Sequence, residues 1–252
     1  RVNLFGVFID DFDIDVVVAL ARASLCGGKA RIFFTPNLEM LDAARKNADI
    51  KKLLNLSSIN LCDGIGVILA SKIIGKPIEH KIAGIDFGEK LLELAQKVGA
   101  RVFLLGGEEG VAERARAKLR IKLPNLDICG THHGYFDDSK NKEICNLINQ
   151  SGADVLLVCR GFPLQEKFVI DNRKSLPNIK VFACLGGSLD VWSGEKQRAP
   201  ECMRNSNLEW KFSPPVQILG QGKPIKERRA PSVPPRMGII IGLTPTCSIA
   251  ST

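Results

Sequence analysis

The strongest constraint on the fold is an alternation of short apolar, β-branched runs with amphipathic stretches, which extends from Val2 to about Phe212. Strands that are separated by helices are typical of a mainly parallel sheet with helices on both faces. The sequence therefore predicts an α/β fold. The clearest predicted strands are ARIFF (30–34), RVFLLGG (101–107), ADVLLVC (153–159) and NIKVFACL (178–185).

Four amphipathic stretches between these runs predict helices. In residues 84–100, the apolar residues Ile85, Leu91, Leu92, Ala95 and Val98 form a helical stripe that ends at a glycine. Residues 108–123 have acidic residues at their start, which suits the positive end of a helix dipole. The other two predicted helices are residues 38–54 and 163–176.

Composition divides the chain of 252 residues into a core and a tail. Seven of the 13 prolines fall in residues 213–252, which show no sustained helical period. We therefore expect a domain over residues 1–212 and an irregular, basic tail over 213–252.

No apolar run approaches the roughly 20 residues of a membrane span, and no signal sequence is evident, so the expectation is a soluble intracellular protein.

The cysteines and the charge exclude some function classes. The eight cysteines never form a C-x-x-C pair and mostly lie in apolar runs, which predicts small buried hydrophobes rather than metal ligands. The net charge of +8 includes +4 from the tail. No basic stripe with interleaved aromatic residues supports a nucleic-acid partner. An anionic small molecule and a membrane surface explain the charge equally well.

Polar or glycine-rich segments follow the predicted strands. Ligands of open parallel sheets bind beyond the carboxyl ends of the strands, and glycine-rich turns can hold phosphate through backbone N–H groups. We therefore expect one shared crevice at this edge. Its segments are TPN (Thr35, Asn37), DGIG (Asp63), GGEEG (106–110), RGFPLQE (160–166) and GGSLD (186–190).

Each segment also has a plain structural interpretation. Asp63 with the following glycine is a common turn pair, and GGEEG is neither a dinucleotide fingerprint nor a phosphate loop of the Walker type. Gln165 and Glu166 could open a solvated helix, Asp190 could cap one, and Lys81 could be a surface charge. The convergence of all these segments on one predicted edge favours a site.

Several motifs occur in a characteristic order: FFTPN, LCDGIGVILASKIIGKPIEHKIAGID, VFLLGGEEGVAERA, THHGYF, GFPLQEKF, GGSLDVWSG, RAP and LEW. Over Val2 to Trp210 the chain resembles the WecG/TagA/CpsF glycosyltransferase family, and its TagA branch most. The resemblance implies a Rossmann-like core and inverting transfer of an N-acetylmannosamine-type sugar from UDP to undecaprenyl-diphosphate-linked N-acetylglucosamine. It also implies a peripheral enzyme at the cytoplasmic membrane surface, acting in teichoic acid or surface glycan assembly, without a metal or other cofactor, and a homodimer.

The resemblance also implies roles for individual residues. Asp63 matches the proposed general base, which would take the proton of the attacking hydroxyl, and Thr35 is the second catalytic candidate. Lys81 stands where the family usually has arginine, so the charge is kept but the bidentate fork is lost. The expected substrate-binding residues are Asn37, Lys81, Gly106, Gly107, Tyr135, Gln165, Glu166, Gly186, Gly187 and Asp190.

The chain departs from the family pattern at Cys159, Arg160 and Phe162, and in the tail after LEW. In the family, the corresponding C-terminal segment is thought to dock on the membrane and to bring arginines to the active site. A catalytically weak protein that binds UDP-sugars is therefore an alternative. A nicotinamide-dependent oxidoreductase is disfavoured, because the G-x-G-x-x-G fingerprint is missing.

Overall fold

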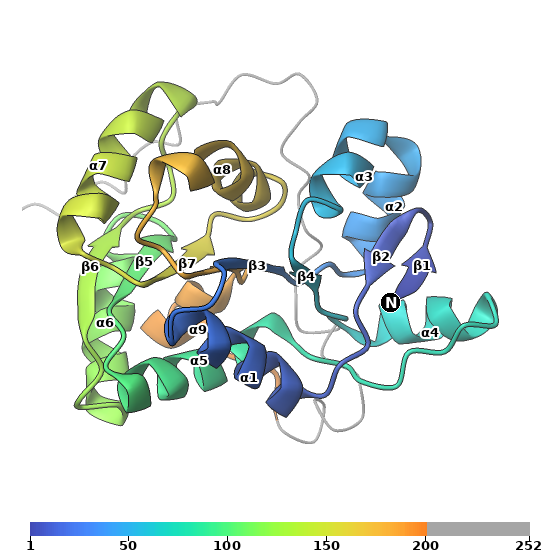
Figure 1. Ribbon diagram of the computed structural model, residues 1–252, viewed down its shortest axis with the longest axis horizontal. Coiled ribbons are helices and arrows are strands. Elements are labelled where there is room, and N and C mark those ends of the chain that lie inside the picture. The colour runs from blue at the N-terminus through green and yellow to red at the C-terminus, as the bar shows by residue number, and fades with distance from the viewer. Residues whose placement is uncertain (201–252) are drawn as a thin grey trace, which may run out of the picture. The chain divides into compact units, whose positions relative to one another are not determined.

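The structure is a computed structural model that describes residues 1–200, so the expected boundary near Phe212 and the tail lie outside the described residues. The regular elements occur in an alternating order along the chain (Figure 1). They are β1 (Val2–Leu4), β2 (Val7–Ile9), α1 (Ile14–Leu25), β3 (Arg31–Phe34), α2 (Leu38–Lys46), α3 (Ala48–Leu54), β4 (Ile59–Asn60), α4 (Ile65–Ile73), α5 (Gly84–Val98), β5 (Val102–Gly106), α6 (Val111–Lys122), β6 (Ile128–His132), α7 (Asn141–Ser151), β7 (Val155–Cys159), α8 (Leu164–Asn172), β8 (Val181–Cys184) and α9 (Ser188–Ser193), with 3₁₀ turns η1 (Asp138–Lys140) and η2 (Arg173–Ser175).

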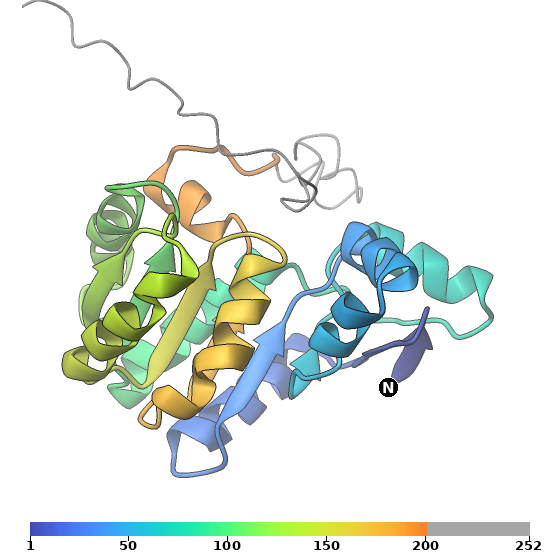
Figure 2. The same cartoon turned by 90° about the horizontal axis from the view of Figure 1, so that it is seen from above.

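The main sheet has six strands in the order β4-β3-β8-β7-β5-β6. Every neighbouring pair in it is parallel, which confirms the predicted sheet (Figure 2). The hairpin of β1 and β2 is antiparallel and forms a separate sheet. All six carboxyl ends of the main strands therefore lie at one edge.

Helices cover both faces of the main sheet, as predicted (Figure 1). In β5, Phe103 and Leu105 belong to the core cluster that includes residues of α2, α3, α7 and α8. Val102 and Leu104 belong to the opposite cluster, with residues of α1, α5, α6 and α9. Because side chains alternate along a strand, β3, β5, β7 and β8 each contribute to both clusters, and both faces are apolar.

The order of the strands indicates where a ligand would bind at the carboxyl edge. After β3 the chain continues into α2 on one face, whereas after its neighbour β8 it continues into α9 on the other face. Adjacent strands whose connections leave to opposite faces form the usual ligand-binding position of an open α/β sheet. Thr35 directly follows β3, and Gly186 lies two residues beyond the end of β8.

Two local predictions differ from the structure. Residues 38–54 form two helices, not one, because Asn47 ends α2 and its side chain accepts hydrogen bonds from Asp49 N and Ile50 N at the start of α3. Helix α6 begins at Val111, so Glu108 and Glu109 lie in the preceding turn. Helix α5 is confirmed, and Gly99 ends it with a left-handed conformation, φ 70°.

The six cysteines within residues 1–200 are free thiols. Cys62, Cys145, Cys159 and Cys184 are buried as predicted, but Cys26 is exposed because it lies in the turn after α1. In the described part of the chain, no helix is both long enough and apolar enough to cross a membrane.

Candidate functional site

Thr35 directly follows β3 and is buried, with 7% of its surface exposed. Its Oγ1 donates a hydrogen bond of 3.1 Å to the carbonyl oxygen of Cys184, at the end of β8. The last residues paired between β3 and β8 are Phe33 and Ala183. The bond from Thr35 therefore links the two chain segments just beyond the end of their strand pairing. A hydroxyl that donates in this way still has lone pairs that can accept a hydrogen bond from a ligand.

Asp63 lies in the turn between β4 and α4 and is half-buried. Gly64 has φ 89°, a positive φ that glycine adopts without strain, and the chain bends there. The N–H of Gly84, at the start of α5, is 3.4 Å from Asp63 Oδ2. A Cβ atom at Gly84 would lie 3.1 Å from Thr35 Oγ1, so both catalytic candidates are positioned against this one glycine.

Cys62 and Lys81 lie close to Asp63. Burial raises the pKa of the Cys62 thiol to about 12; the charges of Asp63 and Asp11 add to this shift and that of Lys81 opposes it. The thiol is therefore protonated at neutral pH and is a poor nucleophile. The Ile82 N–H donates to the Cys62 carbonyl at 2.9 Å, which ties the segment that carries Lys81 to the end of β4.

Asn37 has a clear structural function. Its Oδ1 accepts a hydrogen bond of 3.0 Å from Met40 N, and the residue caps the N-terminus of α2. Asn37 was predicted to bind substrate, but its side-chain oxygen already accepts a hydrogen bond from the first turn of α2.

Gly106 and Gly107, at the end of β5, bring three strands together. Gly106 has φ 148°, and a Cβ atom there would lie 2.2 Å from the carbonyl oxygen of Cys159 in β7. Gly107 N donates to that same carbonyl at 3.1 Å, and Gly107 O accepts from Gly134 N, beyond β6, at 2.8 Å. Only glycine allows this close approach of backbones. Tyr135 follows this contact and is 69% exposed.

Gln165 and Glu166 begin α8 and are buried, with 3% and 0% of their surfaces exposed. Gln165 Nε2 donates to Glu166 Oε1 at 2.8 Å, and Gln165 Oε1 accepts from Gly186 N at 3.1 Å. The second of these bonds connects the first turn of α8 to the turn after β8. The prediction of a solvated helix start is therefore excluded for this pair.

Burial raises the pKa of Glu166 from 4.5 to about 7. The bonds from Gln165 and from its own backbone N–H oppose this shift without cancelling it. Because the folded-state pKa is higher than the unfolded one, the folded state holds an extra proton between about pH 4.5 and 7. The free energy of unfolding therefore contains a contribution that falls as the pH rises through this window.

Gly186 and Gly187 form the turn into α9, and Gly186 has φ 57°. Asp190 is in the first turn of α9, and its Oδ2 is 2.5 Å from Lys196 Nζ. The Lys196 N–H also donates to the Asp190 carbonyl at 3.0 Å. Asp190 therefore holds the segment after α9, in addition to its predicted substrate role.

Arg160 stabilises the loop that follows β6. Its Nε and Nη2 donate to the carbonyl oxygens of Gly134 and Phe136, each at 2.8 Å. Its guanidinium carbon lies 3.7 Å from the centre of the Phe136 ring, and burial lowers the pKa of the arginine. This departure from the family pattern thus provides a contact between the loops after β6 and β7.

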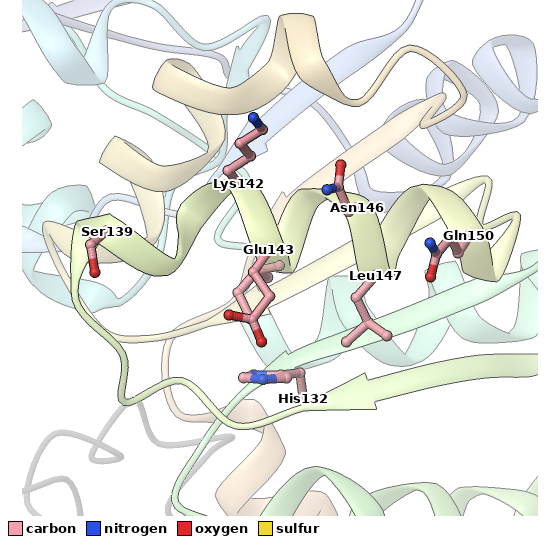
Figure 3. Close-up of a pocket in the computed structure, with 8 residues that line it drawn as sticks. His132, Ser139, Lys142, Glu143, Asn146, Leu147 and Gln150 are labelled. Carbon is pink, nitrogen blue, oxygen red and sulfur yellow. The ribbon is translucent and has the colours of Figure 1, made fainter.

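A hollow of about 620 Å³ lies between α7 and the end of β6. Glu143 and Leu147 point from α7 toward the ring of His132 (Figure 3). None of the predicted site residues lines this hollow. Within residues 1–200, no three His, Cys, Asp or Glu side chains form a cluster that could hold a metal ion.

Two residues at the site were assigned no role from the sequence. Gly84 N donates to Asp63 Oδ2, and a Cβ atom at Gly84 would lie 3.1 Å from Thr35 Oγ1. In the sequence, Gly84 is part of a family motif, but nothing in that motif assigns it a role of its own. Arg198, in the RAP motif, donates a hydrogen bond of 2.6 Å to Oδ1 of Asp86. Asp86 lies two residues after Gly84 in α5. The motif itself was the only signal in the sequence, since a pair separated by 112 positions has no local pattern.

The family described as "Glycosyl transferase WecG/TagA/CpsF family" matches residues 2–213. The chain belongs to this family. It is therefore a glycosyltransferase, and the resemblance seen in the motifs is confirmed.

Three relatives share the name N-acetylglucosaminyldiphosphoundecaprenol N-acetyl-beta-D-mannosaminyltransferase. The protein of Bacillus subtilis (strain 168) is 36% identical, over 71% of this chain and 69% of the relative. That of Bacillus spizizenii (strain ATCC 23059 / NRRL B-14472 / W23) is 33% identical, over 90% and 85%. That of Staphylococcus aureus (strain MRSA252) is 31% identical, over 83% and 82%.

Proposed function

We propose that this glycosyltransferase transfers N-acetylmannosamine from UDP to N-acetylglucosamine linked to undecaprenyl diphosphate, with inversion at the anomeric carbon. The names of the three relatives support the sugar and the acceptor. Such an acceptor is anchored in a membrane, so the reaction takes place at the cytoplasmic membrane surface and contributes to teichoic acid or surface glycan assembly.

The observation that carries the proposal is the placement of Thr35 and Asp63 against Gly84 at the carboxyl edge of the sheet. Helices α2 and α3 and strand β4 separate the two residues in sequence, yet both lie beside Gly84 at the carboxyl edge of the sheet. A carboxylate and a hydroxyl in such a position suit the activation and orientation of an acceptor hydroxyl.

In the proposed reaction, Asp63 is the general base. The acceptor hydroxyl attacks the anomeric carbon while its proton passes to the Asp63 carboxylate, and the bond from that carbon to the UDP oxygen breaks on the opposite face. Thr35 orients the reacting sugar through its hydroxyl oxygen. The departing diphosphate gains negative charge, which the ammonium group of Lys81 stabilises.

The first test measures UDP release from UDP-N-acetylmannosamine in the presence of a soluble diphosphate-linked N-acetylglucosamine analogue. Asp63→Asn is expected to lower acceptor-dependent release by about 10²- to 10⁴-fold, the usual contribution of a general base, with UDP binding retained. Asp127→Asn is the matched control. Asp127 immediately precedes β6, the outer strand farthest from β4, and forms an ion pair with Arg101 on the surface.

The outcomes separate the possible functions. Release that collapses only in Asp63→Asn supports the transferase with Asp63 as its base. UDP binding without any transfer would support the alternative of a UDP-sugar-binding protein. Full activity of Asp63→Asn would exclude Asp63 as the base, and a faster reaction with UDP-N-acetylglucosamine would exclude the proposed donor.

A further inference from the structure

Glu166 is a fully buried acid in the middle of the candidate site. None of its surface is exposed, and its Oε2 has no hydrogen-bond partner among the described residues. Its other oxygen accepts the bond from Gln165 Nε2. Burying a carboxyl group with one unsatisfied oxygen costs free energy, so its presence here requires an explanation other than stability.

The orientation of the Gln165 amide depends on both of its neighbours. The backbone N–H of Gly186 can only donate, so the amide must present its oxygen there. The amide nitrogen then faces Glu166, which supplies the acceptor. If Glu166 offered no acceptor, the amide nitrogen would lose this partner, and the Gln165 side chain would be held only by its bond to Gly186.

The turn that this amide holds is central to the site. Gly186 lies two residues beyond Cys184, whose carbonyl accepts the hydrogen bond from Thr35. Its φ of 57° is a left-handed conformation that glycine adopts easily and also leaves easily. A hydrogen bond at its N–H therefore fixes the path of the chain between β8 and α9.

We propose that Glu166 is a positioning residue: its carboxyl group orients the Gln165 amide, and this amide holds the Gly186–Gly187 turn in place beside Thr35. Glu166 thus acts through Gln165 and does not itself contact substrate. The positioning of the turn follows from the geometry alone, and only its effect on transfer rests on the proposed function.

Hydrogen exchange at the Gly186 amide tests the positioning without any substrate. In protein labelled with ¹⁵N-glycine, Glu166→Met removes the acceptor while keeping most of the volume. We expect it to speed Gly186 exchange about tenfold, the effect of losing one net hydrogen bond. Glu166→Gln keeps an acceptor oxygen and should leave the rate within about threefold of the wild type. Gly134 N, which donates to a backbone carbonyl, is the internal reference.

A double-mutant cycle tests whether Glu166 acts through Gln165. Gln165→Met alone should speed Gly186 exchange about tenfold, and adding Glu166→Met should produce no further increase. For transfer, Glu166→Met should lower kcat/KM about tenfold and Glu166→Gln should restore it. If Glu166→Met does not fold, Glu166→Ala takes its place in the same cycle.

Three results would overturn the proposal: an unchanged Gly186 exchange rate in folded Glu166→Met, an equal loss in Glu166→Gln, or additive effects in the double variant. Failure of the proposed donor or acceptor would leave the exchange results unchanged. The two hypotheses therefore fail in distinguishable ways.

Discussion

Gly106→Ala is expected to lower the stability of the fold, because the new side chain would disrupt the packing of β5 against β7. The residue has φ 148°, a conformation that side chains rarely adopt, and its new Cβ would lie 2.2 Å from the carbonyl oxygen of Cys159. Backbone strain of this kind costs about 1–3 kcal/mol. Overlap that forces backbone to move costs about 1–3 kcal/mol more. The sum is about 4 kcal/mol, which corresponds to a fall in Tm of roughly 10 °C for a domain of this size.

Urea unfolding monitored by circular dichroism measures this loss. Gly161→Ala is the matched control, because Gly161 also has a positive φ, 75°, but no atom lies within 4 Å of the place that its new Cβ would occupy. It should lose only about 1–2 kcal/mol, the cost of a left-handed alanine. If the two variants lose equal stability, the clash with Cys159 contributes nothing and the reasoning is refuted.

Three further perturbations are expected to have measurable effects. Thr35→Val removes the bond to Cys184 O and should cost about 1–3 kcal/mol in urea unfolding, while Thr35→Ser, which keeps the hydroxyl, should cost less. Between about pH 4.5 and 7, the unfolding free energy of the wild type minus that of Glu166→Gln should fall by on the order of 3 kcal/mol as pH rises; a flat difference would contradict the raised pKa. Arg160→Lys loses the two-pronged contact with the loop around Phe136, so amide exchange in residues 133–136 should become severalfold faster, with exchange in α5 as the reference.

Regular elements with strong periodicity could be predicted from the sequence, whereas helix breaks could not. The apolar stripe of residues 84–100 and its terminal glycine predict a helix whose bounds nearly match those of α5 (Gly84–Val98). The break at Asn47 was missed because the apolar period continues through it, and asparagine is unfavourable but not excluded within a helix. The side chain of Asn47 caps α3 by accepting hydrogen bonds from its backbone, a contact that the sequence does not indicate.

Candidate residues of the site could be named from the motifs, but their contacts could not be deduced. Asp63 was identified by its place after a short apolar run and by the family pattern, and Thr35 by the end of a predicted strand. Gly84, which lies beside both, belongs to a family motif, but the motif does not indicate which residues it packs against. Gln165 and Glu166 were expected at the substrate, yet their burial and the bond of Gln165 to Gly186 depend on the order of β7 and β8 in the sheet.

The sequence by itself determined the α/β class, the parallel sheet and the family, because these depend on local periodicity and on the order of short motifs. The tertiary structure decided which carboxyl ends are neighbours, and with it the meeting of Thr35 with Cys184 and of Gln165 with Gly186. Strand order is set by the packing of helices on two faces, which no local stretch encodes. The burial that raises the pKa of Glu166 likewise comes from elements far apart in the chain.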